Sequence, residues 1–148
     1  MDKLQIIKNI KFFDSFSKED LDAIVNFIEV KNYSRGQLIV DLNEVNTSLY
    51  FLLKGSVLVS LHEKPISKIS TFGEIFGEMS ISGAKSSFAK IICDERSSLL
   101  VFNFLGIHEL SARNRDYLEK LVYKSFAEVL AKRLNKANLT IENLKKAS

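Results

Sequence analysis

Several residue types are scarce in this 148-residue sequence, which has one cysteine, one proline, two histidines and no tryptophan. A single cysteine excludes a disulfide within the chain, so we expect Cys93 to be a buried small hydrophobe in a reducing compartment. His62 and His108 are far apart, and neither has the spacing of metal ligands. No cluster of acid, base and nucleophile is visible either. We therefore expect no metal, no cofactor and no enzymatic activity.

Long hydrophobic runs are also lacking. In residues 1–13 charges interrupt the apolar residues, which is unlike a signal peptide or a membrane-spanning helix. Hydrophobic residues make up 46% of the chain and charged residues 26%, as in one soluble globular domain. These features predict a cytoplasmic protein with no membrane partner.

Charge of one sign is concentrated in the C-terminal part, although the net charge is only +3. From Arg113 to Ser148 there are nine Lys and Arg against four Asp and Glu, whereas Met1 to Ala112 has twelve against fourteen. A basic helix is commonly a solvated face, and it is less often a surface for nucleic acid or an acidic partner. Charge alone leaves these alternatives open.

The first 27 residues have the apolar spacing of helices. Residues 2–13 and 17–27 are predicted to be helical, with Ser17 as an N-cap and Asp20 in the third helical position. Asp20 only partly meets the capping-box pattern, which prefers Glu or Gln there.

The middle of the chain consists of short segments rich in Val, Ile, Leu, Phe and Tyr, separated by turn residues. Gly36 and Gly55 stand at two corners, and Pro65 is expected in a hairpin turn because it cannot donate to a central ladder. Many short strands at this spacing predict a barrel or a sandwich. The predicted strands are residues 27–33, 37–42, 49–53, 56–62, 66–69, 88–93 and 98–102.

From about Asn114 the helical spacing returns and continues almost to the end of the chain. One helix of about 30 residues would be about 45 Å long, so its distal half needs a partner. Heptad-like spacing at the end of this helix predicts a homodimer. The alternative is a break near residues 135–138 that folds the helix back onto the body. The predicted dimerisation residues are Phe126, Leu130, Leu134, Ala137 and Ile141.

The order of glycines and aromatic residues resembles the cyclic nucleotide-binding domain family, which includes the ligand domains of the bacterial cyclic AMP receptor protein and of protein kinase A regulatory subunits. Gly36, Gly55 and Gly77 match the spaced glycines of the family, Tyr50-Phe51 its tyrosine-aromatic pair, and Phe76-Gly77-Glu78 its FGE signature. The resemblance covers about residues 12–144. It implies a mainly β fold, namely an eight-stranded, jelly-roll-like β-roll with N-terminal helices, a short cassette helix and a long C-terminal helix.

The resemblance also implies a domain division and a ligand. One domain would span 1–148, with a helical lead-in at 1–27, the β-roll at 28–104 and the C-terminal helical part at 105–148. Cyclic AMP or cyclic GMP would be bound by Glu78 at the ribose hydroxyl and by backbone amides after Gly77 at the phosphate. Asn138 could contact a purine edge. The candidate ligand-binding residues are Phe76, Gly77, Glu78, Met79, Ser80, Lys85, Ser86, Ser87, Phe88, Ala89 and Asn138.

One part of this cassette departs from the family pattern. Ser87 stands where family members usually have the arginine that neutralises the phosphate, and Phe88 replaces a small residue. The loss of that charge-assisted bond predicts an affinity lower by about ten- to hundredfold. Lys85 is the preferred substitute, because strand alternation places Lys90 on the same face as Phe88. The Ser86 and Ser87 hydroxyl groups are a second substitute, and a different ligand altogether is the third alternative.

Two functions remain open at this point. The chain is either a regulatory domain that senses a cyclic nucleotide and signals through its C-terminal helix, or a ligand-independent protein-interaction or dimerisation module. We expect no direct DNA binding, because no helix-turn-helix follows the helix in the sequence.

Overall fold

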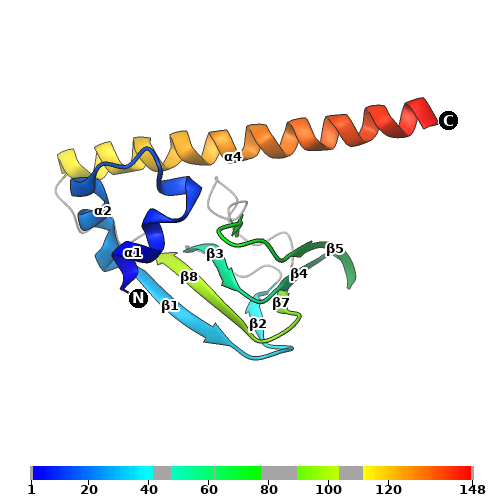
Figure 1. The fold of residues 1–148 in the computed structure, drawn as a ribbon, viewed down its shortest axis with the longest axis horizontal. Helices are drawn as coiled ribbons and strands as arrows, with labels where there is room; N and C mark the ends of the chain where they lie inside the picture. Colours follow the sequence, from blue (N-terminus) through cyan, green and yellow to red (C-terminus); the bar gives the residue numbers. More distant parts are fainter. Residues whose placement is uncertain (1, 42–47, 62, 78–89, 104–111, 148) are drawn as a thin grey trace.

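The computed structural model describes residues 2–41, 48–61, 63–77, 90–103 and 112–147. In these residues two antiparallel four-stranded sheets lie below a helical layer, and one long helix runs along the top of the molecule (Figure 1). The mainly β fold with flanking helices is therefore confirmed.

The helical lead-in is held in place by a reciprocal cap. Ser17 Oγ accepts a hydrogen bond from the Asp20 amide, and the Asp20 carboxylate accepts one from the Ser17 amide, both at 3.1 Å. Aspartate thus completes the capping box that the sequence only partly predicted. The two predicted helices each end in a tighter turn. The elements are α1 Lys3–Lys8, the 3-10 helix η1 Lys11–Phe13, α2 Lys18–Ile24 and the 3-10 helix η2 Val25–Phe27.

Eight strands form the two sheets in the described residues. The order is β1-β8-β3-β6 in the first sheet and β2-β7-β4-β5 in the second. The seven strands predicted from apolar segments are present at their predicted places, and the eighth is a two-residue strand. The strands are β1 Ile28–Tyr33, β2 Leu38–Val40, β3 Ser48–Lys54, β4 Val57–Leu61, β5 Lys64–Ile69, β6 Ile75–Phe76, β7 Lys90–Cys93 and β8 Ser97–Asn103.

The central strands of the first sheet, β3 and β8, are buried on both faces. Along β3, Phe51 packs in the core between this sheet and the helices, whereas Tyr50 and Leu52 pack in the core between the two sheets. Side chains of β8 alternate in the same way, with Leu100 on the helical side and Leu99 between the sheets. Successive side chains of a strand point to opposite faces, so a strand covered on both sides must be apolar at every position. This arrangement explains the unbroken apolar sequences of β3 and β8.

Pro65 is not in a hairpin turn, contrary to the sequence prediction. It lies within β5, opposite Ser60, where the register between β4 and β5 shifts. Because β5 is an edge strand at an irregular position, the missing N–H of proline costs no ladder hydrogen bond. The turn itself contains Glu63, which has a positive φ of 65°.

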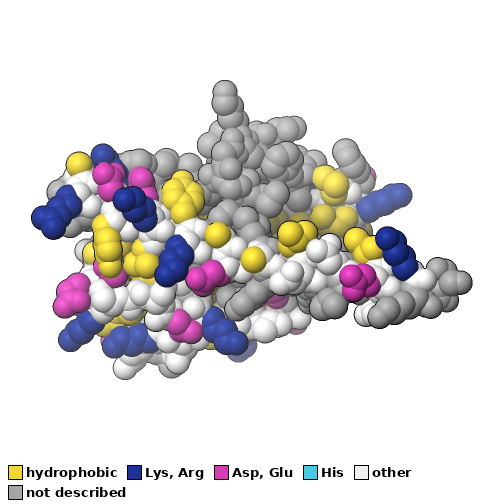
Figure 2. Space-filling view, turned by 90° about the horizontal axis from the view of Figure 1, so that it is seen from above, with side chains coloured by type: hydrophobic (Ala, Val, Ile, Leu, Met, Phe, Trp, Pro, Cys, Tyr) yellow, Lys and Arg dark blue, Asp and Glu magenta, His cyan; other side chains and the backbone are white. Residues whose placement is uncertain are grey.

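The long helix α4 is continuous from Ala112 to Ala147. The 36 residues correspond to about 54 Å at 1.5 Å per residue, and Figure 1 shows the C-terminal part extending past the body. The predicted alternative, a break near residues 135–138, is wrong because the helix does not fold back. Figure 2 shows hydrophobic side chains among charged ones along the outer side of this helix.

Candidate ligand site

The structure describes three of the predicted ligand-binding residues, Phe76, Gly77 and Asn138. The predicted residues from Glu78 to Ala89 lie outside the described residues. What the structure provides is the strand pair that leads into this segment and the strand β7 that follows it.

Phe76 is anchored by β3. The two-residue strand β6 pairs antiparallel with β3, so that Tyr50 lies opposite Phe76. Their rings are stacked, with centroids 5.2 Å apart and planes 11° from parallel, and both residues are buried. Such a pair adds to the area that each ring buries. The aromatic residues of two separate sequence motifs therefore meet in one contact at the start of the predicted cassette.

Gly77 ends β6 in a left-handed conformation, with φ of +83°. Residues with a Cβ rarely adopt this conformation, so glycine is the residue that turns the chain here without strain. A second left-handed glycine, Gly73 with φ of +79°, precedes β6 and donates a hydrogen bond of 2.7 Å to the Leu52 carbonyl. The two glycines therefore fix the direction in which the chain enters and leaves β6.

Gly73 also links this corner to the helical lead-in. A Cβ at this position would lie 3.8 Å from a methyl group of Ile10, which is ordinary van der Waals contact. Ile10 is 1% exposed and belongs to the core on the helical side of the first sheet. The entrance of the predicted cassette thus lies directly against the lead-in.

Lys90 and Asn138 both follow the predicted ligand segment in the sequence, Lys90 directly and Asn138 on the long helix. Lys90 begins β7, where Ile91 and Cys93 are buried between the sheets, so strand alternation directs Lys90 to the other face. Asn138 is exposed on α4. Its contact with a purine stays a prediction.

Cys93 is a free, buried thiol, as the sequence predicted. Burial raises its pKa above the usual value, and a hydrogen bond with Ser97 partly opposes that shift. A neutral thiol in a core is a packing residue and a poor nucleophile. Among the described residues no group of His, Cys, Asp and Glu could hold a metal ion. Within the same residues, none of the helices has both the length and the apolar character needed to cross a bilayer.

The predicted dimerisation residues are only partly described. Leu134 is 62% exposed and Ile141 51% exposed on α4. The side chains of Phe126, Leu130 and Ala137 lie outside the described residues. The seam itself therefore stays a prediction.

One feature was not predicted from the sequence. Pairing of β1 with β8 brings the turns that contain Arg35 and Arg96 together around a pocket. The presence of an arginine in each of two short turns, next to strands that pair with each other, could have indicated this pocket.

Taken together, the described residues define a helix-flanked β-roll in which a short strand lies between two left-handed glycines. The chain belongs to the cyclic nucleotide-binding domain family, whose family model matches residues 30–114. This family is a binding domain and is not itself catalytic.

Two relatives and one solved structure illustrate the similarity. Cyclic GMP-binding protein C of Dictyostelium discoideum is 30% identical over 125 residues, which cover 82% of this chain and 5% of that protein. A cGMP-dependent protein kinase of Eimeria tenella is 31% identical over 91 residues, which cover 62% of this chain and 9% of the kinase. This chain thus spans less than a tenth of the length of either relative.

The fold similarity covers more of this chain than the two sequence matches just described. The crystal structure of a cyclic nucleotide-binding domain from Methylobacillus flagellatus superposes with a TM-score of 0.74 at 21% identity. The superposition covers 93% of this chain and 79% of that one. At this identity the match supports the fold, including the helices outside residues 30–114.

Proposed function

We propose that this chain is a regulatory domain that binds cyclic AMP or cyclic GMP in the segment from Gly77 to Ala89 and signals through α4. The observation that carries the proposal is the family match over residues 30–114 together with the Phe76-Gly77-Glu78 motif within it. The stacked Tyr50–Phe76 pair and the left-handed Gly77 support it, because they place the chain for a turn into a ligand segment.

The chemistry of the proposed site follows from its residues. Glu78 would accept a hydrogen bond from the ribose 2′-hydroxyl, and backbone amides after Gly77 would hold the singly charged cyclic phosphate. Ser87 cannot supply the positive charge that arginine supplies in the family pattern. Lys85 is our preferred substitute for it. We expect cyclic GMP to be the better ligand to test first, since both relatives described above are named for cyclic GMP.

A route for the signal is available through the lead-in. Gly73, at the entrance of the proposed site, lies against Ile10. The lead-in in turn contacts α4, where Leu118 is 2% exposed in the same core cluster as Ile10. Movement at the cassette would therefore reach α4 through one continuous packed core.

The C-terminal half of α4 is the proposed dimer interface. Leu134, Ile141 and Leu144 are 62%, 51% and 66% exposed, which is unusual for three leucine and isoleucine side chains on one helix. Exposed apolar surface that is spaced along a helix is typical of a seam for a second helix. A second copy of this chain would bury it.

Isothermal titration of the full chain with cyclic AMP and cyclic GMP tests the binding proposal. We expect Glu78→Ala to lose binding. Glu95→Ala should retain it, because this control substitution removes the same charge at an exposed position in the turn before β8. Absence of heat at millimolar concentrations of both nucleotides would contradict the sensor function.

Restoring the missing arginine is a sharper test. Ser87→Arg should tighten cyclic nucleotide binding by about ten- to hundredfold, since a charge-assisted hydrogen bond to the phosphate is gained. Ser70→Arg is the matched control, because it adds the same charge at an exposed position in the loop before β6, away from the proposed site. Equal gains in both variants would show that only net charge matters.

The second candidate function is a ligand-independent interaction module. Ser87 and Phe88 in place of an arginine and a small residue favour it, and so does the protruding, exposed end of α4. In that case Glu78→Ala would leave every partner interaction intact. Charge reversal at Lys132, Arg133 and Lys136 would abolish binding of an acidic partner.

A further inference from the structure

A pocket lies at the end of the roll where the β1–β2 turn meets the β7–β8 turn. It has a volume of about 290 Å³ and is formed by residues 32–35 and Arg96, and we call it the turn pocket. This volume corresponds to about ten water molecules at 30 Å³ each, which exceeds the space that a bare oxyanion needs. All five residues lie within the described chain, outside the segment of the proposed nucleotide site.

Hydrogen bonds hold the two turns rigidly together. The Gly36 amide donates to the Cys93 carbonyl at 2.8 Å, and the Cys93 amide donates to the Gln37 carbonyl at 2.9 Å. The Ser34 amide donates to the side-chain oxygen of Gln37 at 3.0 Å, which closes the first turn. The pocket floor is therefore preorganised, so a ligand would not need to order it.

The turn between β3 and β4 supports the β7–β8 turn through hydrogen bonds. The Ser97 hydroxyl lies 3.1 Å from the Ser56 carbonyl and 2.7 Å from the Glu95 carbonyl, and Ser97 is 2% exposed. Gly55 fits against this arrangement, because a Cβ there would collide with Ser97 and with the Arg96 carbonyl. Arg96 is thus attached to backbone that is fixed from two sides.

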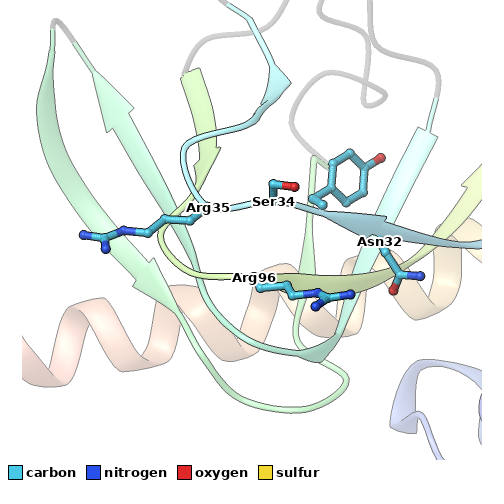
Figure 3. Close-up of a pocket in the computed structure, with 5 residues that line it drawn as sticks. Asn32, Ser34, Arg35 and Arg96 are labelled. Carbon is cyan, nitrogen blue, oxygen red and sulfur yellow. The ribbon is translucent and has the colours of Figure 1, made fainter.

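The pocket lining contains several hydrogen-bond donors. Asn32 Oδ1 accepts a hydrogen bond of 2.6 Å from the Ser98 hydroxyl, which leaves the amide group of Asn32 to donate. Figure 3 shows Arg96 extending toward Asn32, whereas Arg35 extends in the opposite direction, away from both of them. Burial is the main cause that raises the pKa of Tyr33, and the nearby Cys93 and Glu29 raise it further. The Tyr33 hydroxyl group therefore keeps its proton.

The two guanidinium groups have no ion pair among the described residues. Two nearby carboxylates are already paired elsewhere, Glu29 with Lys31 at 3.6 Å and Asp94 with Lys68 at 3.2 Å. Arginine is suited to phosphate because its planar group donates two parallel hydrogen bonds. Arg35, which lines the same pocket but points away from Arg96, adds a second positive charge nearby, and this favours a doubly charged group over a singly charged one.

We propose that the turn pocket binds a phosphate monoester group, with Arg96 and the Asn32 amide as its direct donors and Arg35 as the second charge. The phosphate is carried either by a small metabolite or by a phosphorylated residue of another protein. This site goes beyond the proposed cyclic nucleotide function and does not depend on it.

Nuclear magnetic resonance titration of the ¹⁵N-labelled full chain tests the proposal, with inorganic phosphate, O-phosphoserine and an alanine-flanked phosphoserine peptide as probes. We expect saturable shifts of the Gly36, Arg96 and Ser97 amides at millimolar concentrations. Binding to the peptide that is tighter than binding to O-phosphoserine supports a protein-borne phosphate, and equal binding supports a small metabolite. Shifts only around Gly77 would assign the phosphate to the nucleotide site and overturn the turn pocket.

Three variants complete the test. Arg96→Gln should weaken binding at least about tenfold, since a charge-assisted hydrogen bond is lost. Asn32→Asp should abolish it, because the carboxylate retains the acceptor for Ser98 but repels phosphate. Lys31→Gln removes one positive charge on the same strand outside the pocket and should change affinity by less than about twofold. Amide shifts that survive Arg96→Gln, with the fold confirmed by an unchanged spectrum elsewhere, would overturn the proposal.

Discussion

The two halves of α4 have the same secondary structure but different surroundings. In the N-terminal half, Leu118 is 2% exposed among the phenylalanines of the lead-in, and Tyr117 donates a hydrogen bond of 3.4 Å to the carboxylate of Asp20. In the C-terminal half, Leu134 and Leu144 are 62% and 66% exposed. The comparison teaches that, among the described side chains, packing against the body stabilises the first part of this helix, whereas helix propensity supports its continuation.

This difference bears on function as well. A helix that is attached at one end and exposed at the other can transmit a displacement of its attached end over its full length. The same asymmetry makes the exposed end available to a partner. The predictions below test the difference between the two halves, from the largest expected effect to the smallest.

Truncation of the packed half should have the largest effect. Leu118→Ala should lower the free energy of unfolding by about 2–5 kcal/mol, because it leaves a cavity in the core shared by α4 and the lead-in. The measurement is urea denaturation at low protein concentration. Leu144→Ala is the matched control on the exposed half, and we expect a change within about 0.5 kcal/mol. Equal losses in both variants would contradict the asymmetry.

Charges in the exposed half should act on assembly. Leu134→Glu combined with Ile141→Glu should give a monomer in sedimentation, since two like charges would face each other across the proposed seam. The stability of the monomer should remain unchanged, because both residues are exposed in the single chain. An unchanged sedimenting mass would count against a dimer through this surface.

Removal of the Ser17 cap of α2 should have a moderate effect on stability. Ser17→Ala removes the acceptor for the Asp20 amide and should cost about 1 kcal/mol of unfolding free energy. Thermal unfolding measures it, with Ser17→Asp as a control that retains a capping oxygen. A full loss in the control variant would show that the hydroxyl group acts in some other way than as a cap.

Removal of the hydrogen bond between the lead-in and α4 should have the smallest effect. Tyr117→Phe should lower stability by about 0.5 kcal/mol, because the hydrogen bond is long and Tyr117 is 56% exposed. A double-mutant cycle with Asp20→Asn, which can still cap α2, isolates the coupling between the two side chains. Additive effects of the two substitutions would mean that this bond does not couple α2 to α4.

Much of the fold could be predicted from the sequence because apolar periodicity records which faces are buried. The seven apolar segments, the lead-in helices and the uninterrupted final helix were all visible in this way. Pro65 was misplaced because the sequence does not reveal which strand is an edge, and within a sheet proline is tolerated at edges and irregular positions. The two-residue strand β6 is too short to carry a period of its own.

The candidate site was predictable to a lesser extent. The Phe76-Gly77-Glu78 motif and the substitution at Ser87 are local patterns, so the sequence alone shows them. The turn pocket was not predictable, because Arg35 and Arg96 are 61 positions apart and meet only through the pairing of β1 with β8.

The sequence by itself determined the class of the fold, the left-handed corners at its glycines and the presence of a long final helix. Each of these depends on neighbouring residues, through apolar period, backbone freedom and helix propensity. Only the tertiary structure decided which half of α4 is buried, which strand tolerates Pro65 and which arginines share a pocket. These outcomes depend on the order in which strands pair and on the layer that covers each face, and residues distant in sequence set both.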